Sequence, residues 1–300
     1  MDIRILKYSF FSIAEFGFNE QIALLEKRGM VIDMEPNKVK EILLDIGYYR
    51  LGFYWHPFVI DDNHNLLEGI KFSDIVNLYY LDVDLRNILT RYLNRIEINF
   101  RTKIVYYVSN KFKLSPTWFI DPKIVSQDFI NDIDKYYSSD FKKSNKPIKK
   151  HHQKYLNDKY APAWKTLEFF TFGVVLKIFK NLHDNYIKER ISNIYGVKNM
   201  NKFISLIETL VLLRNTCAHG GVLFDLKIPK GISKIPEIEF NNNDRMSLDS
   251  SIKVVLYFLQ KISNDRKCDL EKSINEIFEK YRNNGFVKRI IEGDINYIYE

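Results

Sequence analysis

The longest stretch of helix-like hydrophobic spacing runs from Ser73 to about Phe112. Apolar residues recur there every three or four positions, which places them on one face of an α-helix. Ser73 is a suitable N-cap, because its hydroxyl can accept a hydrogen bond from a backbone N–H of the first turn. This helix would exceed the usual length, so we expect a kink or a division. The predicted buried stripe consists of Leu78, Leu81, Leu85, Ile88, Tyr92, Ile96, Phe100, Ile104 and Val108.

Shorter segments have the same helical spacing. Residues 19–46 form one, and residues 164–182 form another, in which Gly173 is a candidate interruption. A further helix is predicted from about Asn201 to Ala218, and two amphipathic helices, about 247–262 and 269–282, close the chain. The apolar positions of the 201–218 helix are Phe203, Leu206, Ile207, Leu210, Val211 and Leu213.

Other segments break the helical pattern. Residues 47–58 carry two glycines and a proline among aromatic residues, so we expect an irregular aromatic plug packed on the core. Residues 222–246 contain Pro229, Pro236 and short β-prone pieces, which predict a loop or a small ribbon. The fold class predicted from these patterns is all-α.

Composition supports a packed core and an acidic partner. The chain is 46% hydrophobic, with 22 Phe and 19 Tyr but few Gly and Pro, which argues against disorder. A net charge of +7 suggests either nucleic acid or an anionic membrane surface as partner, although a basic protein without a polyanion partner fits too. No apolar run approaches a membrane span, and the N-terminus has no pattern of a secretory signal. Two cysteines without metal-ligand spacing fit a reducing cytoplasm, so we expect cytoplasmic localisation.

The most concentrated basic segment is residues 142–154, which contain no acidic residue. We interpret it as an exposed loop around Pro147 that either is simply solvated or contacts the phosphates of RNA. The residues assigned to RNA binding are Lys142, Lys143, Lys146, Lys149 and Lys150, together with Arg95 and Arg101 of the long helix.

The residues with the clearest chemical potential end the helix predicted over 201–218. Arg214, Asn215 and His219 lie there, and Gly220-Gly221 stops the helix. Histidine can move a proton near neutral pH, and arginine forks onto phosphate oxygens, so this pair suits RNA phosphodiester cleavage. The bare spacing is weak evidence, because it nearly recurs from Arg50 to His56. On an ideal helix Arg214 and His219 lie about 140° apart, so either Arg214 curls around or two copies of the motif meet in a dimer.

These residues carry a family resemblance. Arg214-Asn215-x-x-x-His219 resembles the signature of the HEPN superfamily, and the chain over roughly residues 20–225 is similar to Abi-like abortive-infection proteins. The landmarks, in order, are the segment Gly47 to Phe58, the segment Leu85-Arg86 through Arg101, Phe172-Gly173, and Leu213 to His219. The family often has an arginine shortly after the histidine. Gly220-Gly221-Val222 lacks this arginine here, so a phosphate contact from that position is not expected.

The resemblance implies a HEPN-like helical bundle with additional N- and C-terminal helices. We expect residues 1–70 to form an N-terminal helical and aromatic segment, residues 71–222 the HEPN-like core, and residues 223–300 the C-terminal loop and helices. The resemblance further implies metal-independent RNA cleavage without a cofactor, in a cleft assembled by a homodimer. A role in bacterial defence against phage is implied as well, with a small noncoding RNA as a possible regulator.

Other polar residues have plainer interpretations. We expect Arg50 and His56 to be structural among aromatic rings, and Glu97 and Arg101 to form an ion pair, with a role in orienting Arg214 or His219 as the minority alternative. His151 and His152 are expected to face solvent. Asp82 and Asp84 lack a third carboxylate for a metal, and Cys217 is expected to pack as a small residue.

Two functional hypotheses follow. In the first, the protein is an endoribonuclease in which Arg214 binds the scissile phosphate, His219 exchanges protons, and Asn215 holds the imidazole or a phosphate oxygen. In the second, it is a non-catalytic RNA-binding or interaction protein, and the three residues only cap and cross-link a helix end. The intact Arg-Asn-His set favours the enzyme.

Overall fold

A computed structural model describes residues 17–299, and over this range the protein is all-α, as predicted. Backbone pairing outside helices amounts to isolated bridges, such as Val31 with Lys71, and no strand forms in the described part of the chain. The N-terminal residues, on which the expectation of no secretory signal rests, lie outside the described residues. No helix between residues 17 and 299 is both long and apolar enough to cross a membrane.

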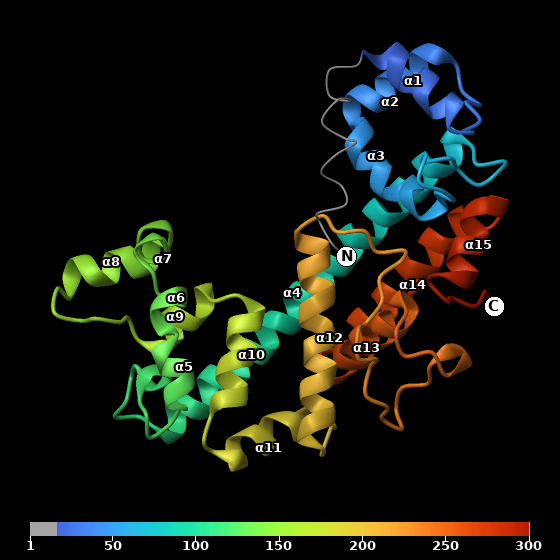
Figure 1. Cartoon of the computed structure of the whole chain (residues 1–300). Coiled ribbons are helices and arrows are strands. Elements are labelled where there is room, and N and C mark those ends of the chain that lie inside the picture. The colour runs from blue at the N-terminus through green and yellow to red at the C-terminus, as the bar shows by residue number, and fades with distance from the viewer. Residues whose placement is uncertain (1–16, 300) are drawn as a thin grey trace. The chain divides into compact units, whose positions relative to one another are not determined.

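The chain forms two compact units, and the boundaries between them fall inside the helices α4 (Phe72–Lys111) and α14 (Asn264–Lys280) and just after Gly293. The first unit holds the described residues up to Leu85 together with Glu276–Gly293, and the second holds Arg86–Asn275 and the C-terminal residues from Asp294. Each unit therefore combines segments that are far apart in the sequence (Figure 1).

The first unit contains helices α1 (Phe18–Lys27), α2 (Pro36–Asp45), α3 (Tyr48–Trp55) and α15 (Gly285–Gly293), and the 3₁₀ turn η3 (His56–Phe58). The ring of Phe58 meets that of Phe286 at 5.1 Å, which joins the N-terminal part to α15. A hydrogen bond of 3.2 Å from Tyr54 to the buried Asp82 adds a polar contact.

Helix α4 (Phe72–Lys111) is a continuous α-helix of 40 residues, so the expected division is wrong. Its sequence contains neither glycine nor proline, the residues that most often break a helix. The predicted stripe is buried except for Ile88, which is partly exposed. A sequence that buries one side of each turn can extend a helix well beyond the average length.

The second unit is built around the C-terminal part of α4, from Arg86 on. Its long helices are α10 (Phe172–Asn181), α11 (Asn185–Ile194), α12 (Met200–Ala218), α13 (Leu248–Ile262) and α14 (Asn264–Lys280), of which the last continues into the first unit. Shorter helices are α5 (Gln127–Asn131), α6 (Ile133–Tyr136), α7 (Ser139–Ser144), α8 (Lys146–Lys154), α9 (Ala163–Phe169), and the turns η4 (Trp118–Ile120) and η5 (Asn241–Asn243).

A cluster of aromatic rings forms the centre of this unit. Phe100 of α4 meets Phe179 of α10 at 5.3 Å and Phe203 of α12 at 6.1 Å between ring centroids. Phe203 also contacts Phe258 of α13 and the buried Tyr195. Four helices thus share one core, and each fully buried ring contributes about 1.5–3 kcal/mol of hydrophobic stabilisation.

Several predicted segments have different boundaries in the structure. The helix expected over 19–46 is divided into α1 and α2, because Gly29 takes a positive φ of 92°. The segment 47–58 is helical rather than irregular, since Gly47 precedes α3 with φ 90° and Pro57 falls in η3 after it. In 164–182 the break lies at Thr171, whose side chain caps α10, and Gly173 lies inside that helix.

The basic segment 142–154 is also helical, which corrects the predicted loop. It spans the end of α7 and all of α8, and Asn145 between them has an extended backbone. Pro147 lies in the first turn of α8, where no intrahelical partner is needed for its missing N–H. Helices α11 and α15 were not expected from the hydrophobic pattern at all.

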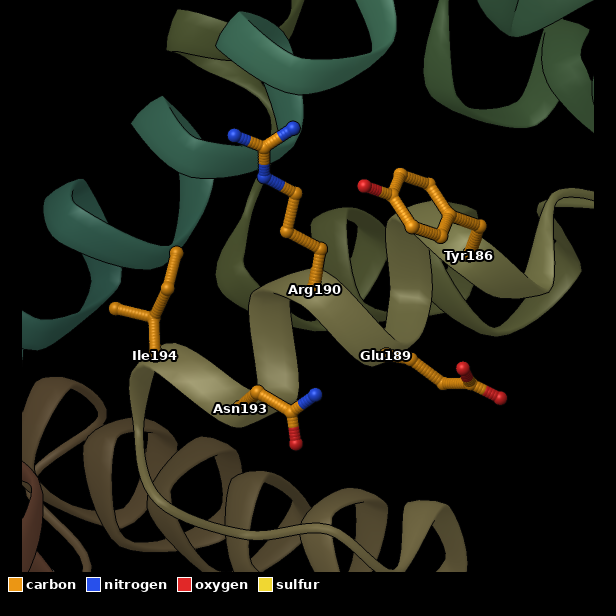
Figure 2. Close-up of a pocket in the computed structure, with 5 residues that line it drawn as sticks. All are labelled: Tyr186, Glu189, Arg190, Asn193 and Ile194. Atoms are coloured by element: carbon orange, nitrogen blue, oxygen red, sulfur yellow. The ribbon is translucent and has the colours of Figure 1, made fainter.

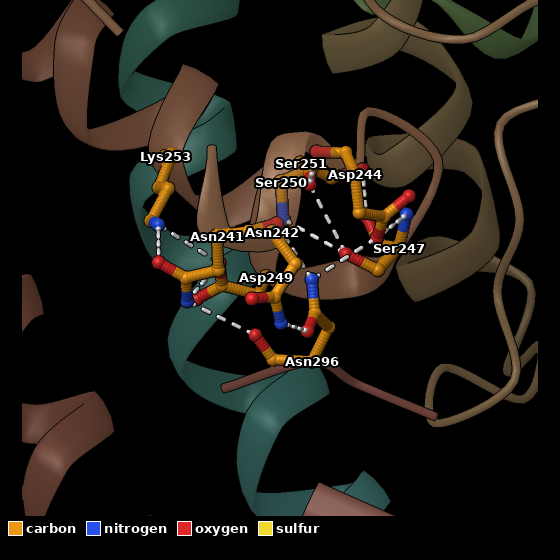
Figure 3. A network of polar contacts seen from close by, with 9 residues as sticks. All are labelled: Asn241, Asn242, Asp244, Ser247, Asp249, Ser250, Ser251, Lys253 and Asn296. Atoms are coloured by element: carbon orange, nitrogen blue, oxygen red, sulfur yellow. Dashed lines mark hydrogen bonds and ion pairs between the residues drawn. The ribbon is translucent and has the colours of Figure 1, made fainter. Parts of the chain in front are cut away.

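The loop expected over residues 222–246 is confirmed as irregular, apart from η5. A polar network anchors its end to the last residues of the chain (Figure 3). Asn241 donates to Asp249 at 3.1 Å and to the carbonyl of Asn296 at 3.0 Å, and Asn296 donates back to the carbonyl of Asn241 at 3.1 Å. Burial raises the pKa of Asp249, although Lys253 beside it acts in the opposite direction. The network satisfies its own polar groups, as a structural tie would.

Candidate active site at the end of helix α12

Helix α12 begins and ends with clear capping interactions. Asn199 accepts a hydrogen bond from the backbone N–H of Lys202 at 3.0 Å. At the other end Gly220 takes φ 65°, and the N–H of Gly221 bonds the carbonyl of Thr216 at 2.8 Å. This is a Schellman cap, which needs a residue in the left-handed region just after the helix. A Cβ on Gly221 would lie only 2.7 Å from the Thr216 side chain, so both glycines fit the cap closely.

His219 is the last residue before this cap and is exposed to solvent. Its backbone N–H bonds the carbonyl of Asn215 at 3.0 Å, which fixes the Cα position of the histidine. Among residues 17–299 its imidazole has no hydrogen-bond partner. Both ring nitrogens are therefore accessible to an external proton donor or acceptor.

Arg214 is half-buried and held from two sides. Its Nε donates to Oε2 of Glu97 at 3.0 Å, and its Nη1 donates to Oδ1 of Asn215 at 3.3 Å. The Nη2 group has no hydrogen-bond partner within the described part of the chain. The guanidinium is thus oriented by two acceptors and keeps donors for an anion, while 24% of the side chain remains exposed.

Glu97 links two arginines inside the helical core. Its Oε1 accepts from Nη2 of Arg101 at 2.5 Å, and its Oε2 accepts from Arg214. Arg101 also donates to the carbonyl of Phe170 at 3.1 Å. One buried carboxylate thus faces two guanidinium groups, and the exposed Glu168 lies 3.9 Å from Arg101 as a second, more distant carboxylate. The expected Glu97–Arg101 ion pair is confirmed, and Glu97 orients Arg214 as well.

Arg86 is a contributor that the sequence reasoning did not assign. It is almost fully buried, and its Nη1 donates to the carbonyl of Gly221 at 3.1 Å. The contact holds the chain just after His219 against α4. Arg86 lies eleven residues before Glu97, so both project from the same side of α4. The eleven-residue spacing between Arg86 and Glu97 is the sequence feature that could have identified Arg86 as part of the site.

The residues predicted to bind RNA lie in three environments. Lys143, Lys146, Lys149 and Lys150 are exposed on α7 and α8, and Lys142 lies 5.3 Å over the ring of Tyr137. Arg101 is 7% exposed and engaged by Glu97, so its side chain does not reach a surface that RNA could contact. Arg95 lies on the side of α4 opposite to Glu97, because two positions turn a helix by about 200°.

Most of the other polar residues considered in the sequence have structural roles, as expected. Arg50 lies over the rings of Phe53 and Tyr54, as expected of a structural residue, whereas His56 is exposed. Asp84 pairs with Lys280 at 3.1 Å, and Cys217 is buried. No group of three His, Cys, Asp or Glu side chains within residues 17–299 is arranged to hold a metal.

The expectation that His151 and His152 face solvent is wrong. His151 is 5% exposed, and its Nε2 lies 3.0 Å from Asp158. His152 is partly buried, with its Nε2 2.9 Å from the hydroxyl of Tyr137. Burial, with the charges of Lys142 and His151, lowers the pKa of His152. Both imidazoles lie on the inner face of α8, because a short helix must pack one face even in a lysine-rich segment.

All four sequence landmarks and the end of α12 lie within one match to a known protein family. No curated protein and no solved structure matches the chain. The family of Abi-like proteins matches it over residues 41–225, a range that includes α3, α4 and the whole of α12. Because this match spans well over half of the sequence, the chain belongs to the family of Abi-like proteins.

Proposed function

We propose that this protein is a metal-independent endoribonuclease of an abortive-infection system, which acts as a toxin on RNA in infected bacterial cells. Membership of the Abi-like family suggests the abortive-infection role. The observation that carries the nuclease assignment is that one helix end holds both an oriented, partly exposed Arg214 and an accessible His219. A HEPN-like arrangement of the helical core is part of this proposal.

The proposed reaction is attack by the ribose 2′-OH on the adjacent phosphorus. His219 removes the proton from the 2′-OH or gives a proton to the leaving 5′-oxygen. Arg214 binds the non-bridging oxygens through its unpartnered Nη2 and stabilises the charge that develops there. Asn215 keeps the guanidinium in place through its side-chain oxygen. The products would be a 2′,3′-cyclic phosphate and a 5′-hydroxyl, and no metal takes part.

The proposal includes assembly and regulation. One chain supplies one Arg214 and one His219, and a homodimer would bring two copies of the motif into a single cleft. The exposed lysines of α7 and α8 would contact the phosphates of the substrate. A small noncoding RNA would restrain the toxin before infection.

A second function is supported by one observation. The pairing of Arg214 with Glu97 also links α12 to α4, which is what a purely structural arginine would do. In that case the protein would bind RNA or another partner without cutting it, and the helix-end residues would contribute stability alone.

Substitution of the two proposed catalytic groups separates these functions. We expect His219→Ala and Arg214→Ala to abolish RNA cleavage and cell toxicity, since each removes a group that acts on the reacting atoms. Circular dichroism should show an intact helical fold for His219→Ala, because this side chain is exposed. His183→Ala is the matched control, since His183 is also exposed, and it should cleave normally. Wild-type cleavage by His219→Ala would refute the proposed site.

A further inference from the structure

Helix α11 presents an open groove that the proposed active site does not use. Tyr186, Glu189, Arg190, Asn193 and Ile194 line a pocket of about 500 Å³ along one face of this helix (Figure 2). A second pocket of about 390 Å³ shares Glu189 and Asn193 with the first and continues to Gly196 and Lys198. The two pockets therefore follow the length of α11, and we call them together the α11 groove.

Two of the groove's side chains approach the C-terminal part of α4. Arg190 extends toward α4 in Figure 2, and its guanidinium lies 4.6 Å from the ring centroid of Tyr107. The ring of Tyr186 lies beside the Arg190 side chain, whereas the carboxylate of Glu189 points away from the guanidinium. Stacking on Tyr107 holds the planar guanidinium in a defined orientation and leaves its N–H groups at the edge of the plane for an acceptor.

Two further cations of α4, Lys103 and Arg95, lie near Tyr195, the residue that follows α11. Lys103, one turn before Tyr107, lies 5.3 Å over the ring of Tyr195 and donates to Asn99 at 2.7 Å. The Nε of Arg95, two turns earlier, is buried and has no hydrogen-bond partner. Burial and the charge of Arg95 lower the pKa of Lys103, which shows that the two cations lie close enough to repel each other.

These cations lack acidic partners. Within residues 17–299, no carboxylate lies within ion-pair distance of Arg95, Lys103 or Arg190. Lys111, at the end of α4, shows the contrast, because Asp184 pairs with it. Like charges gathered without counter-ions raise the free energy of the folded protein unless an anion binds there. An anionic ligand would therefore be stabilised beside these cations.

Exposed aromatic rings accompany the cations. Tyr186 is 65% exposed and Tyr106 on α4 is 61% exposed, although such rings usually pack against other groups. Cations beside exposed rings form the combination that binds single-stranded nucleic acid, in which phosphates meet the charges and unstacked bases meet the rings.

We infer that the α11 groove, with Arg190 in its lining and with Lys103 and Arg95 of α4 near Tyr195 at the end of α11, binds single-stranded RNA. The phosphates lie against the three cations and one base stacks on Tyr186. Glu189 and Asn193 face the base edge, where the carboxylate accepts from an amino group and the side-chain amide both donates and accepts. Duplex RNA is a poor fit because its bases are already stacked. An acidic peptide has no base that could stack on Tyr186, and its carboxylates would be repelled by the carboxylate of Glu189. The inference rests on RNA being the substrate, as proposed above.

Binding can be measured apart from cleavage. The full-length His219→Ala protein would be titrated into a fluorescent single-stranded RNA of about 12 nucleotides, and anisotropy would be recorded over a range of salt concentrations. Arg190→Gln tests the phosphate contact, with Lys188→Gln as the matched control on the opposite side of α11. Tyr186→Ala tests stacking, with Tyr186→Phe as the control that keeps the ring.

We expect Tyr186→Ala to weaken binding about tenfold, while Tyr186→Phe binds like the parent protein. Arg190→Gln should weaken binding and reduce the salt slope by about 0.7, and Lys188→Gln should leave the slope unchanged. RNA that carries 4-thiouridine should cross-link to the peptide containing Tyr186.

Equal binding by Arg190→Gln and Lys188→Gln would overturn the inference. Duplex RNA or an acidic peptide that binds the groove as tightly as the single strand would overturn the choice of ligand. If the wild-type protein cleaves RNA but the α11 variants bind RNA as tightly as the parent protein, the groove is not the RNA-binding site, although the nuclease proposal stands. If the α11 variants lose RNA binding but the wild-type protein does not cleave RNA, the nuclease proposal is refuted and the RNA-binding groove stands.

Discussion

The C-terminal end of α12 and the helices α7 and α8 are both basic, yet their charges are held in different ways. At α12 the guanidinium of Arg214 has two fixed acceptors, Glu97 and Asn215, and is mostly buried. On α7 and α8 the lysines are almost all exposed, and Lys142, Lys143, Lys146, Lys149 and Lys150 have no carboxylate partner within the described residues. A fixed fork can stabilise a transition state, whereas mobile ammonium groups attract any polyanion. The first region is therefore suited to chemistry and the second to affinity.

The largest expected difference between these regions is their response to exchange of arginine and lysine. Arg214→Lys keeps the charge but loses the planar fork, so we expect cleavage to slow about a hundredfold. Changing the five lysines to arginine keeps mobile charges on the surface and should leave the rate within about twofold. Single-turnover kinetics would measure both rates. Equal effects of the two changes would remove the distinction between fixed and mobile charge.

A second effect concerns the stability that comes from Glu97. Glu97→Gln removes the buried carboxylate from Arg101 and leaves only the exposed Glu168 near it, so we expect the free energy of unfolding to fall by about 3 kcal/mol. Glu168→Gln is the matched control, because Glu168 is 60% exposed and lies 3.9 Å from the same arginine. It should change stability by less than about 0.5 kcal/mol. Urea denaturation of both variants tests this expectation, and similar losses would show that Glu97 is not the central partner.

The smallest effect is expected from neutralising the basic helices. Replacing the five lysines with Gln should weaken RNA binding and lower the salt slope by about 0.7 for each lysine that contacts a phosphate. The rate at saturating RNA should stay close to that of the wild type. The matched control neutralises five other exposed lysines, Lys27, Lys123, Lys202, Lys230 and Lys234. If both sets lower the slope equally, α7 and α8 act only through net charge.

The sequence allowed the strongly periodic helices to be predicted well. The spacing of apolar residues in α4 and α12 located both helices to within a residue or two, and Gly220-Gly221 correctly indicated the end of α12. Glycine and proline were less informative. Gly29 ends a helix, whereas Gly52 and Gly173 lie inside helices, because a glycine breaks a helix only where the backbone takes a positive φ.

The sequence identified the residues of the candidate site, but it did not specify the contacts between them. Arg214, Asn215 and His219 could be found from the motif alone. The link from Glu97 to both Arg101 and Arg214 depends on how α4 and α12 pack, and no local pattern specifies that. The same limit applies to Arg86 and to the burial of His151, since composition suggested only an exposed basic segment.

Metal-independent cleavage is best tested by incubating single-stranded RNA with the purified protein in excess EDTA and analysing the new ends. We expect undiminished cleavage that leaves a 2′,3′-cyclic phosphate and a 5′-hydroxyl, because His219 and Arg214 supply proton transfer and charge stabilisation themselves. RNA with a 2′-deoxy sugar at the cut position should not be cleaved, because it lacks the attacking 2′-OH. Complete loss of cleavage in EDTA, restored by magnesium, would refute the metal-independent mechanism.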